Sequence, residues 1–489
     1  MLRLIFPSRI LSISCVLLGT LICDSFAQST HLLSDSLRGS RPNIVLFLAD
    51  DQTIFDHSTY GNSKVKTPAT DKFSKEALVF EKAFTGQAIC APSRSILYSG
   101  LYPIRNGCFV NHTGIRPGIK TLPYYLKELG YEVVLAGKSH INPQEQFPWS
   151  KWMRPVRLEG KPRASVPFEE INSYIRNSDK PFCLIVASEY PHGPYFEKSS
   201  FSPEDVKLHP FENDTAGHRK YVSRYYESIL EKEREFEKVL DILDSNNIHN
   251  DTIVFYADDH GVFRGKFTTY DSGLNVGFMV RWPSKINPGR TKALTSFVDI
   301  VPTLIELAGN DRFDLSNFDG KSLIRVFENK LSINHDYVFA VAHNQGIINR
   351  HIFPQRSIHD GRYHYIYNFN ALDRLEKLDI KNKDMLYFLQ RGAKKHPNQT
   401  EEELYDTLND PFELVNLSQN PSLLTIKNKL KNELFGWMSS QNDFLTLDSP
   451  IPIFDVKDRY QLDRSNSRYD VPTSKIGKLS KSMENVHNL

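Results

Sequence analysis

The stretch Asn43–Asp51 reads NIVLFLADD and joins a continuous apolar run to two adjacent carboxylates. Such a run is typical of a central parallel strand that is buried on both faces. Similar short runs recur at Val133–Ala136, Phe182–Ala187, Thr252–Ala257 and Gly277–Val280. Helical patterns lie between them, at Leu122–Leu129 and Arg219–Leu243. Because strands alternate with helices, the sequence predicts an α/β domain with a large, mainly parallel sheet flanked by helices.

Polar residues directly follow several of these predicted strands. They are Asp50-Asp51, Lys138–His140, Glu189–His192 and Asp258–His260. In open parallel sheets, ligands bind beyond the carboxyl ends of the strands. We therefore expect the functional site at this edge of the sheet.

The chain changes character after about Gly320. The segment Ile358–Phe369 places an Asp-Gly turn between two short mixed runs, which predicts a hairpin in a smaller antiparallel subdomain. Asn416–Phe444 has the pattern of a helix with its flanks. We expect a catalytic domain over residues 28–340, a C-terminal subdomain over 341–455 and a loosely attached polar tail over 456–489.

The composition of the 489 residues, 40% hydrophobic and 24% charged, is that of an average globular protein. The length is enough for two or three core-forming units. Lysine and arginine number 60 against 58 aspartates and glutamates, so the formal net charge is +2. Because the basic residues are also scattered, we expect no nucleic acid partner.

The first residues have the pattern of a secretory signal peptide. Arg3 and Arg9 precede the apolar run Ile10–Cys23, and cleavage is expected before Gln28. The run is shorter than the roughly 20 residues of a spanning helix. A membrane anchor, a core helix and a lipoprotein signal are the alternatives. We expect residues 1–27 to be removed and the protein to be exported, to the periplasm or the medium, or to a lysosome or the extracellular space in a eukaryote. No later stretch is long and apolar enough for a stable membrane span.

Removal of this segment leaves Cys90, Cys108 and Cys183. In an oxidising compartment, an odd number of cysteines calls for an explanation of the unpaired thiol. Cys108 and Cys183 can pair or stay buried, and the sequence does not choose between these states.

Two acidic strand ends indicate a metal site. In a dry site, Asp50 and Asp51 both stay ionised only near a compensating cation, and carboxylate oxygens suit a hard divalent metal. Asp258-Asp259-His260 follows another strand in the same manner. Because imidazole also suits zinc or manganese, His260 leaves the identity of the metal open. The alternatives are a helix N-cap at the first pair and an Asp- and Gly-rich turn at the second.

Further cations and imidazoles are expected at the same edge: Lys138, His140, His192 and Lys266. Together with a metal they suit a substrate that carries several anionic oxygens. Such groups neutralise charge that develops in the transition state, and a histidine can act as a general acid toward the leaving group. The alternative for any single lysine is a solvated surface position.

The segment Cys90–Arg94 reads CAPSR and resembles the C-x-P-S-R signature of the type I sulfatases, members of the alkaline-phosphatase-like superfamily. Other stretches are similar to the same family, in the same order over roughly residues 41 to 420: PNIVLFLADD, TLPYYLKELGYEVVLAGKSH, YADDHG, GKFTTYDSG and ELYDTLNDPFELVNL. The resemblance implies an alkaline-phosphatase-like sandwich with a smaller C-terminal antiparallel sheet.

The resemblance also implies that a maturation enzyme oxidises Cys90 to Cα-formylglycine, whose hydrate is a geminal diol. One hydroxyl of the diol attacks sulfur and releases the substrate alcohol or amine. The other hydroxyl lets the sulfated intermediate collapse to the aldehyde and expel sulfate. A sulfate ester on serine, by contrast, would need water to attack sulfur again.

The site residues implied by the resemblance fall into two groups. The ligands of a divalent metal, usually calcium, would be Asp50, Asp51, Cys90 as formylglycine, Asp259 and His260. Arg94 would hold the formylglycine hydrate, and the sulfate-binding and leaving-group residues would be Lys138, His140, His192 and Lys266. The family often has asparagine where this chain has His260.

Two further stretches, NHTGIRPGIKTLP and GKSHINPQEQFPW, are similar to bacterial sulfatases related to heparan N-sulfatase (sulfamidase). They imply a sulfated glycan, such as a glycosaminoglycan, as the substrate. His112 and Arg116 are candidates for contacts with its sugar or carboxylate groups, or else ordinary loop residues. Lys266 differs from sulfamidases proper, so O-sulfate and N-sulfate both remain open.

The motifs leave two alternatives to a sulfatase. A phosphodiesterase or phosphonate monoester hydrolase of the same superfamily can share the fold, the metal ligands and the formylglycine. An inactive protein that binds sulfated glycans is the other alternative. Every expected catalytic position is filled, which argues against the inactive protein.

Overall fold

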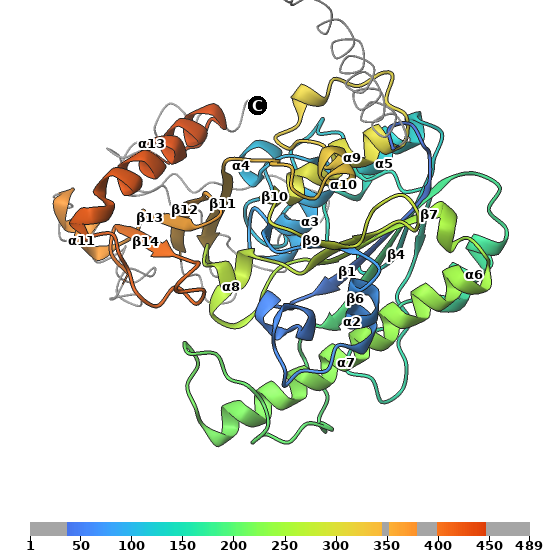
Figure 1. The fold of residues 1–489 in the computed structure, drawn as a ribbon, viewed down its shortest axis with the longest axis horizontal. Coiled ribbons are helices and arrows are strands. Elements are labelled where there is room, and N and C mark those ends of the chain that lie inside the picture. The colour runs from blue at the N-terminus through green and yellow to red at the C-terminus, as the bar shows by residue number, and fades with distance from the viewer. Residues whose placement is uncertain (1–36, 345–351, 379–398, 446–489) are drawn as a thin grey trace, which may run out of the picture.

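The computed structural model describes residues 37–344, 352–378 and 399–445 (Figure 1). The predicted signal peptide and the predicted polar tail lie outside the described residues. Within the described part of the chain, no helix combines the length and the apolar character needed to cross a membrane.

A sheet of eight strands forms the centre of the molecule, in the order β5-β4-β6-β1-β7-β8-β2-β9. Strand β1 (Asn43–Asp50) pairs in parallel with β6 (Phe182–Pro191) on one side and β7 (Thr252–Asp258) on the other. Strand β4 (Glu132–Gly137) continues the parallel set, whereas β8 (Phe278–Arg281) pairs antiparallel with β7. The remaining strands are β5 (Lys151–Met153), β2 (Leu78–Phe80) and β9 (Gly289–Thr291). The predicted mainly parallel sheet is confirmed.

The side chains of β1 alternate between two cores, which is why its sequence is apolar throughout. Val45 and Phe47 pack on one face, and Ile44 and Leu46 pack on the other. Helices α2 (Pro68–Ser74), α6 (Phe168–Arg176) and α7 (Ala216–Ser245) supply the first core; α3 (Cys90–Ser99), α5 (Leu122–Glu128) and α9 (Ile300–Leu307) supply the second (Figure 1).

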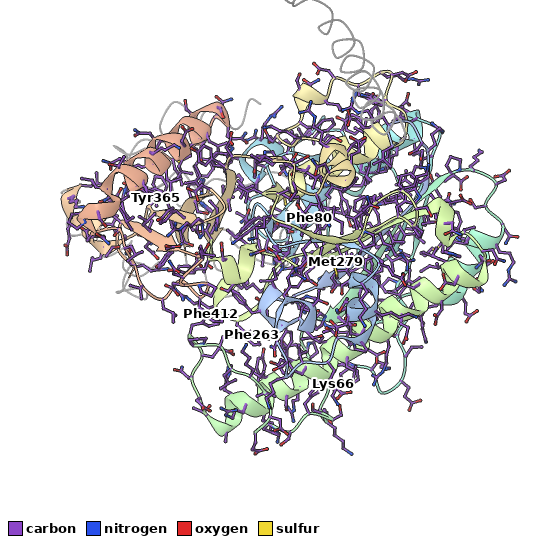
Figure 2. The ribbon with its side chains drawn as sticks, viewed as in Figure 1. Lys66, Phe80, Phe263, Met279, Tyr365 and Phe412 are labelled. Atoms are coloured by element: carbon purple, nitrogen blue, oxygen red, sulfur yellow. The ribbon has the colours of Figure 1, made fainter. Side chains whose placement is uncertain are left out.

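The same division extends to the other end of the sheet. Phe80 of β2 belongs to the core beside α3 and Met279 of β8 to the core beside α7, and side chains fill both layers (Figure 2).

A second sheet of four antiparallel strands lies to one side of the first: β11 (Val338–Asn344), β12 (Ile352–His359), β13 (Tyr363–Asn368) and β14 (Glu402–Asp406). The predicted hairpin is β12–β13, and its turn places Gly361 at φ +93°, a value that favours glycine. Helix α13 (Leu424–Ser440) packs against this sheet, as expected for the helical pattern near the C-terminus (Figure 1). The smaller antiparallel sheet is therefore confirmed.

Several short elements complete the fold. They are β3 (Ala83–Phe84), α4 (Pro103–Asn106), α8 (Asp271–Leu274), β10 (Thr295–Ser296), α10 (Ile324–Glu328) and α11 (Leu372–Lys377). Two of them, β3 and β10, pair in parallel. Cys90, Cys108 and Cys183 are all buried and unpaired, so of the two alternatives for Cys108 and Cys183 the structure has burial without a disulfide.

Helix α7 carries charged residues on its buried face. Glu235 is 2% exposed and accepts hydrogen bonds from Ser188 Oγ (2.5 Å) and from the backbone N–H of Val166 (3.1 Å). Burial raises the pKa of Glu235 to about 7 in spite of these bonds. The folded protein therefore binds a proton here that the unfolded chain releases near pH 4.5.

We expect the free energy of unfolding to fall as the pH rises from 5 to 8, because ionised Glu235 is unfavourable in the folded state. The contribution of Glu235 to the free energy of unfolding is complete below its pKa in the unfolded chain. It is lost as the pH rises through its pKa in the folded protein. Glu235→Gln should abolish about 2 kcal/mol of this loss, measured by urea unfolding at both pH values. Glu237→Gln, an exposed change on the same helix, is the control. An equal pH dependence in wild type and Glu235→Gln would contradict the assignment.

Candidate active site

Asp50 and Asp51 stand at the carboxyl end of β1, where both side chains are buried. Asp51 has φ +67°, a left-handed conformation that aspartate tolerates better than most residues. Its backbone N–H donates to Asp259 Oδ1 (3.0 Å). The end of β1 is therefore bonded to the residue that follows β7.

Asp259 lies beside Asp50 because β1 and β7 are paired in register, with Ala49 opposite Asp258. The backbone N–H of Asp259 donates to the carbonyl of Ala49 (2.9 Å). The carboxylate of Asp258 is bonded elsewhere, to Tyr256 OH (2.8 Å) and to His57 Nε2 (2.7 Å). Of the two adjacent aspartates, Asp259 is thus the one that joins the cluster at the edge of the sheet.

Cys90 begins helix α3 and points into this cluster. Its Sγ lies 3.7 Å from Asp50 Oδ1 and 3.2 Å from His260 Nε2. Burial alone would raise the pKa of the Cys90 thiol, but the charges of Lys138 and Lys266 hold that pKa well below its ordinary value. The position is therefore buried, polar and electropositive.

The rest of the CAPSR segment explains how Cys90 is held. Ser93 Oγ donates to the carbonyl of Asp259 (2.5 Å), and Thr85 Oγ1 donates to Ser93 Oγ (2.8 Å). Arg94 is fully buried, with Nη2 3.0 Å from Asp259 Oδ2 and 3.6 Å from Asp50 Oδ1. Helix α3 is thus tied to the end of β7 by one hydroxyl and one guanidinium.

Two lysines form ion pairs with the carboxylates of Asp50 and Asp51. Lys138, which follows β4, forms an ion pair with Asp50. Lys266 Nζ lies 2.7 Å from Asp51 Oδ2. Burial disfavours the charged form of each lysine, yet the neighbouring carboxylates raise the pKa of both above the ordinary value. The lysines therefore carry their charge inside the site.

Histidines complete the site. His260 Nε2 lies 3.3 Å from Asp51 Oδ1, and His192 Nε2 lies 3.6 Å from Asp51 Oδ2. His140 contacts His112, with 2.8 Å between His140 Nε2 and His112 Nδ1. All the metal-ligating, sulfate-binding and leaving-group residues expected from the sequence thus meet at one edge of the sheet.

The two candidates for substrate contacts differ in position. His112 lies beside the site through His140, whereas Arg116 Nη1 donates to the carbonyl of Arg105 (3.3 Å). Asn111 is a site neighbour that the sequence reasoning missed. Its Oδ1 accepts from the N–H of Ala91 (3.3 Å), and its Nδ2 contacts His112 Nε2 (3.2 Å).

The donor set fits a divalent metal. Ligand atoms of Asp50, Cys90, Asp259 and His260 all lie within 4.8 Å of one another, and all four residues are buried. The carboxylate of Asp51 adjoins the same position, because its Oδ1 lies 3.3 Å from His260 Nε2 and one of its oxygens lies within 4.8 Å of Cys90 Sγ. Several carboxylate oxygens with one imidazole form a set that a hard or borderline divalent ion accepts.

A sulfatase family model matches residues 42–310, and a model of the C-terminal part of N-sulphoglucosamine sulphohydrolase matches residues 258–388. An ulvan-active sulfatase of Formosa agariphila is 42% identical over 94% of this chain and 92% of that protein. Human N-sulphoglucosamine sulphohydrolase is 24% identical over 86% of this chain and 95% of that protein. The solved structure of a 2-O GAG sulfatase has a similar fold, with a TM-score of 0.65 and 22% identity over 82% of this chain and 93% of that chain.

We expect Ca²⁺ to raise the melting temperature, because an ion that binds the folded state alone stabilises it by about 2.7 kcal/mol at a hundred times its Kd. Asp259→Asn should lose most of this rise, since it removes a ligand charge. Asp241→Asn, exposed on α7, is the control. Differential scanning fluorimetry with Ca²⁺, Mn²⁺ and Zn²⁺ tests both the site and the metal. An undiminished rise in Asp259→Asn would place the ion elsewhere.

Proposed function

The chain belongs to the sulfatase family and is a sulfuric ester hydrolase, and we propose that it removes O-linked sulfate from a sulfated polysaccharide of the ulvan type. The observation that carries the choice of substrate is the 42% identity to an ulvan-active sulfatase along almost the whole chain. The named N-sulfate relative is more distant, at 24% identity. The similarity to sulfamidases therefore indicates the wider group of sulfatases to which this chain is related. The ulvan-type substrate is the more specific proposal.

In this proposal the cations of the site bind the sulfate group. Arg94, Lys138 and Lys266 surround Cys90 and each neutralises a carboxylate in the absence of substrate. A sulfate that enters between them meets preorganised positive charge in a dry site, where electrostatic interactions are stronger than in water. The protein's net charge of +2 is too small to attract a polyanion by itself, so this local cluster supplies the attraction.

The nucleophile is proposed to arise from Cys90, converted to Cα-formylglycine by a maturation enzyme. A formylglycine hydrate supplies a hydroxyl that attacks sulfur and a second one that allows sulfate to be expelled. Residues of this chain hold that position: Asp50 and His260 contact the Cys90 side chain, and Arg94 lies between Asp50 and Asp259. The amino end of α3 adds the favourable end of its dipole.

We propose that Asp50, Asp51, Asp259 and His260, with the modified Cys90, hold a divalent metal, calcium first. A bound divalent ion would polarise a sulfate oxygen and lower the cost of negative charge near the nucleophile. Its carboxylate ligands already face one another, so the folded chain presents them in advance.

Protonation of the leaving oxygen is assigned to the histidines beside Cys90. His192 has a donor atom within 4.8 Å of those of Asp51 and Cys90. His140 contacts His112, with 2.8 Å between His140 Nε2 and His112 Nδ1. A general acid close to the leaving oxygen contributes typically about 10²–10⁴-fold to such reactions.

Export is part of the proposal. A polysaccharide substrate lies outside the cytoplasm, and the pattern of residues 1–27 is that of a secretory signal. We therefore place the enzyme in the periplasm or outside the cell.

Cys90→Ala should abolish sulfate release, a loss of at least about 10³-fold in kcat, because it removes the nucleophile. Cys108→Ala, a change of another buried cysteine, should keep the activity and is the control. The tryptic peptide that contains residue 90 should be about 18 Da lighter than its thiol form, as expected for a thiol converted to an aldehyde. Full activity in Cys90→Ala would contradict the mechanism.

Ulvan oligosaccharides should release sulfate faster than N-sulfated glucosamine does, when matured enzyme is supplied with each and free sulfate is measured by ion chromatography. An aryl phosphate diester serves as the comparison for the phosphodiesterase alternative. Faster release from the N-sulfate would return the substrate to the sulfamidase type. A preference for the diester would change the reaction class.

A further inference from the structure

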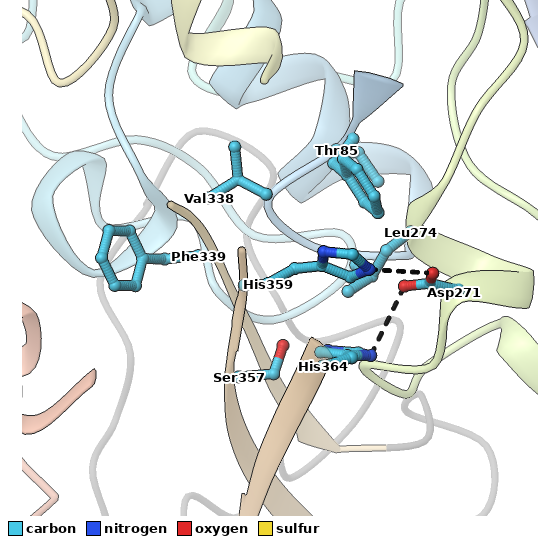
Figure 3. A pocket seen from close by; sticks show the side chains of 10 residues that line it. Thr85, Asp271, Leu274, Val338, Phe339, Ser357, His359 and His364 are labelled. Carbon is cyan, nitrogen blue, oxygen red and sulfur yellow. Dashed lines mark ion pairs between the residues drawn. The ribbon is translucent and has the colours of Figure 1, made fainter. Parts of the chain in front are cut away.

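A second cluster of metal-ligating side chains lies between the two sheets. It consists of Asp271 at the start of α8, His359 on β12, His364 on β13 and Glu413 in the loop after β14. Each of these residues is at most 3% exposed. Figure 3 shows Asp271 between the two histidines, with one carboxylate oxygen toward each. This cluster shares no residue with the catalytic site.

Histidines pair directly with the carboxylates of this cluster, while the charges of Lys82 and Arg264 act on Asp271 and Glu413 without an ion pair among the described residues. In the described part of the chain, every ion pair of Asp271 and Glu413 runs to a histidine. Arg264 contacts the carbonyl of Glu413 and not its carboxylate. Two buried carboxylates without a lysine or arginine partner require protons or a cation.

One carboxylate oxygen also has no hydrogen-bond donor among the described residues. Asp271 Oδ1 is buried and accepts no hydrogen bond from them, although it faces His364 Nδ1 at 3.4 Å. The other acceptor of the cluster is better used, because Glu413 Oε2 accepts from the backbone N–H of Asp271 (2.7 Å). A buried carboxylate oxygen without a donor is unfavourable unless something else occupies its lone pairs.

One ligand atom each of Asp271, His364 and Glu413 lies within 4.8 Å of the other two. Zinc bonds to nitrogen and oxygen are about 2.0–2.2 Å, so neighbouring ligands of a tetrahedral ion lie roughly 3.3–3.6 Å apart. His364 Nδ1 and Asp271 Oδ1 are 3.4 Å apart. His364 Nδ1 and Glu413 Oε1 are hydrogen-bonded at 2.5 Å, so these two side chains would separate by about 1 Å to hold an ion between them. Beside Asp271 and His364, a small cavity of about 10 Å³ has room for one water molecule.

His359 has a different role in this cluster from that of His364. Its Nδ1 accepts from the N–H of Gly361 (2.8 Å), so its ring proton is on Nε2, which contacts Thr407 Oγ1 at 3.2 Å and faces Asp271 Oδ2 at 3.4 Å. A nitrogen that carries its proton cannot bind a metal. His359 therefore lies outside the ligand set, beside Asp271, where outer-shell partners of metal ligands are commonly found.

We propose that Asp271, His364 and Glu413 form a second metal site, with a water molecule from the adjacent cavity as the fourth ligand and zinc as the ion. One imidazole and two carboxylates are ligands that a borderline divalent ion accepts. The ion would join α8 to β13 and to the loop after β14. It would thereby fix the segment that also carries Lys266.

The test measures zinc content in the full-length protein. The catalytic site is first saturated with Ca²⁺, the protein is equilibrated with Zn²⁺ and desalted, and zinc is counted by inductively coupled plasma mass spectrometry. We expect about one zinc ion per chain in wild type, with a higher melting temperature, and close to none in His364→Gln. Glutamine retains a side-chain N–H donor and removes the imidazole nitrogen that would bind the ion. His335→Gln, whose parent histidine pairs with Asp299 elsewhere, is the matched control.

Three results would overturn the proposal. Equal zinc in wild type and His364→Gln would make the cluster a hydrogen-bonded junction. Loss of the zinc in Asp259→Asn would place the ion in the catalytic site. Wild type without zinc would exclude the second site directly. If circular dichroism shows that His364→Gln is unfolded, Asp271→Asn takes its place, with the same expected loss.

Discussion

The mutual repulsion of three buried carboxylates is the constraint on which the rest of the structure depends. Asp50, Asp51 and Asp259 converge at one edge of the sheet, and all are nearly inaccessible to water. Each carboxylate forms an ion pair with a different cation: Asp50 with Lys138, Asp51 with Lys266 and Asp259 with Arg94. Loss of a single partner would leave an uncompensated buried charge, which costs about 3–5 kcal/mol. The segments after β4 and β7 and helix α3 are therefore held in place by charge as well as by packing.

The parallel sheet makes this convergence possible. Strands that run in the same direction end at the same edge, so residues from distant parts of the chain become neighbours. The register of β1 with β7 sets Asp259 beside Asp50, and the hydroxyl of Ser93 fixes helix α3 on the same corner. Cys90 then lies where the carboxylates and the cations meet. A shift of one residue in this register would turn Asp259 to the opposite face, where Asp258 now lies.

Much of this arrangement could be predicted from the sequence, because buried parallel strands have continuous apolar runs and polar ends. The strand ends, the hairpin around Gly361 and the convergence of the acidic and basic groups all follow from such patterns. Contacts between side chains could not be predicted in the same way. Asn111 looks like any loop residue until the fold brings it to Ala91. The charged residues on the buried face of α7 could not be predicted either. From the sequence Lys232 is expected to be solvated, yet it pairs with Glu233 and donates to Tyr256 OH (2.8 Å). Periodicity cannot separate a buried ion pair from an exposed one.

The smaller sheet is part of the same electrostatic arrangement. The chain from Arg264 to Asp271 carries Lys266, and several of its other residues form hydrogen bonds with the C-terminal unit. The N–H of Thr269 donates to Gln355 Oε1 (3.1 Å), Tyr270 OH donates to Glu403 (3.0 Å), and Arg264 donates to the carbonyl of Phe412 (3.1 Å). Lys266 reaches Asp51 from a segment that the second sheet holds on several sides. Displacement of that sheet would therefore move a cation of the catalytic site, and the two sheets build one site although just one of them supplies its carboxylates.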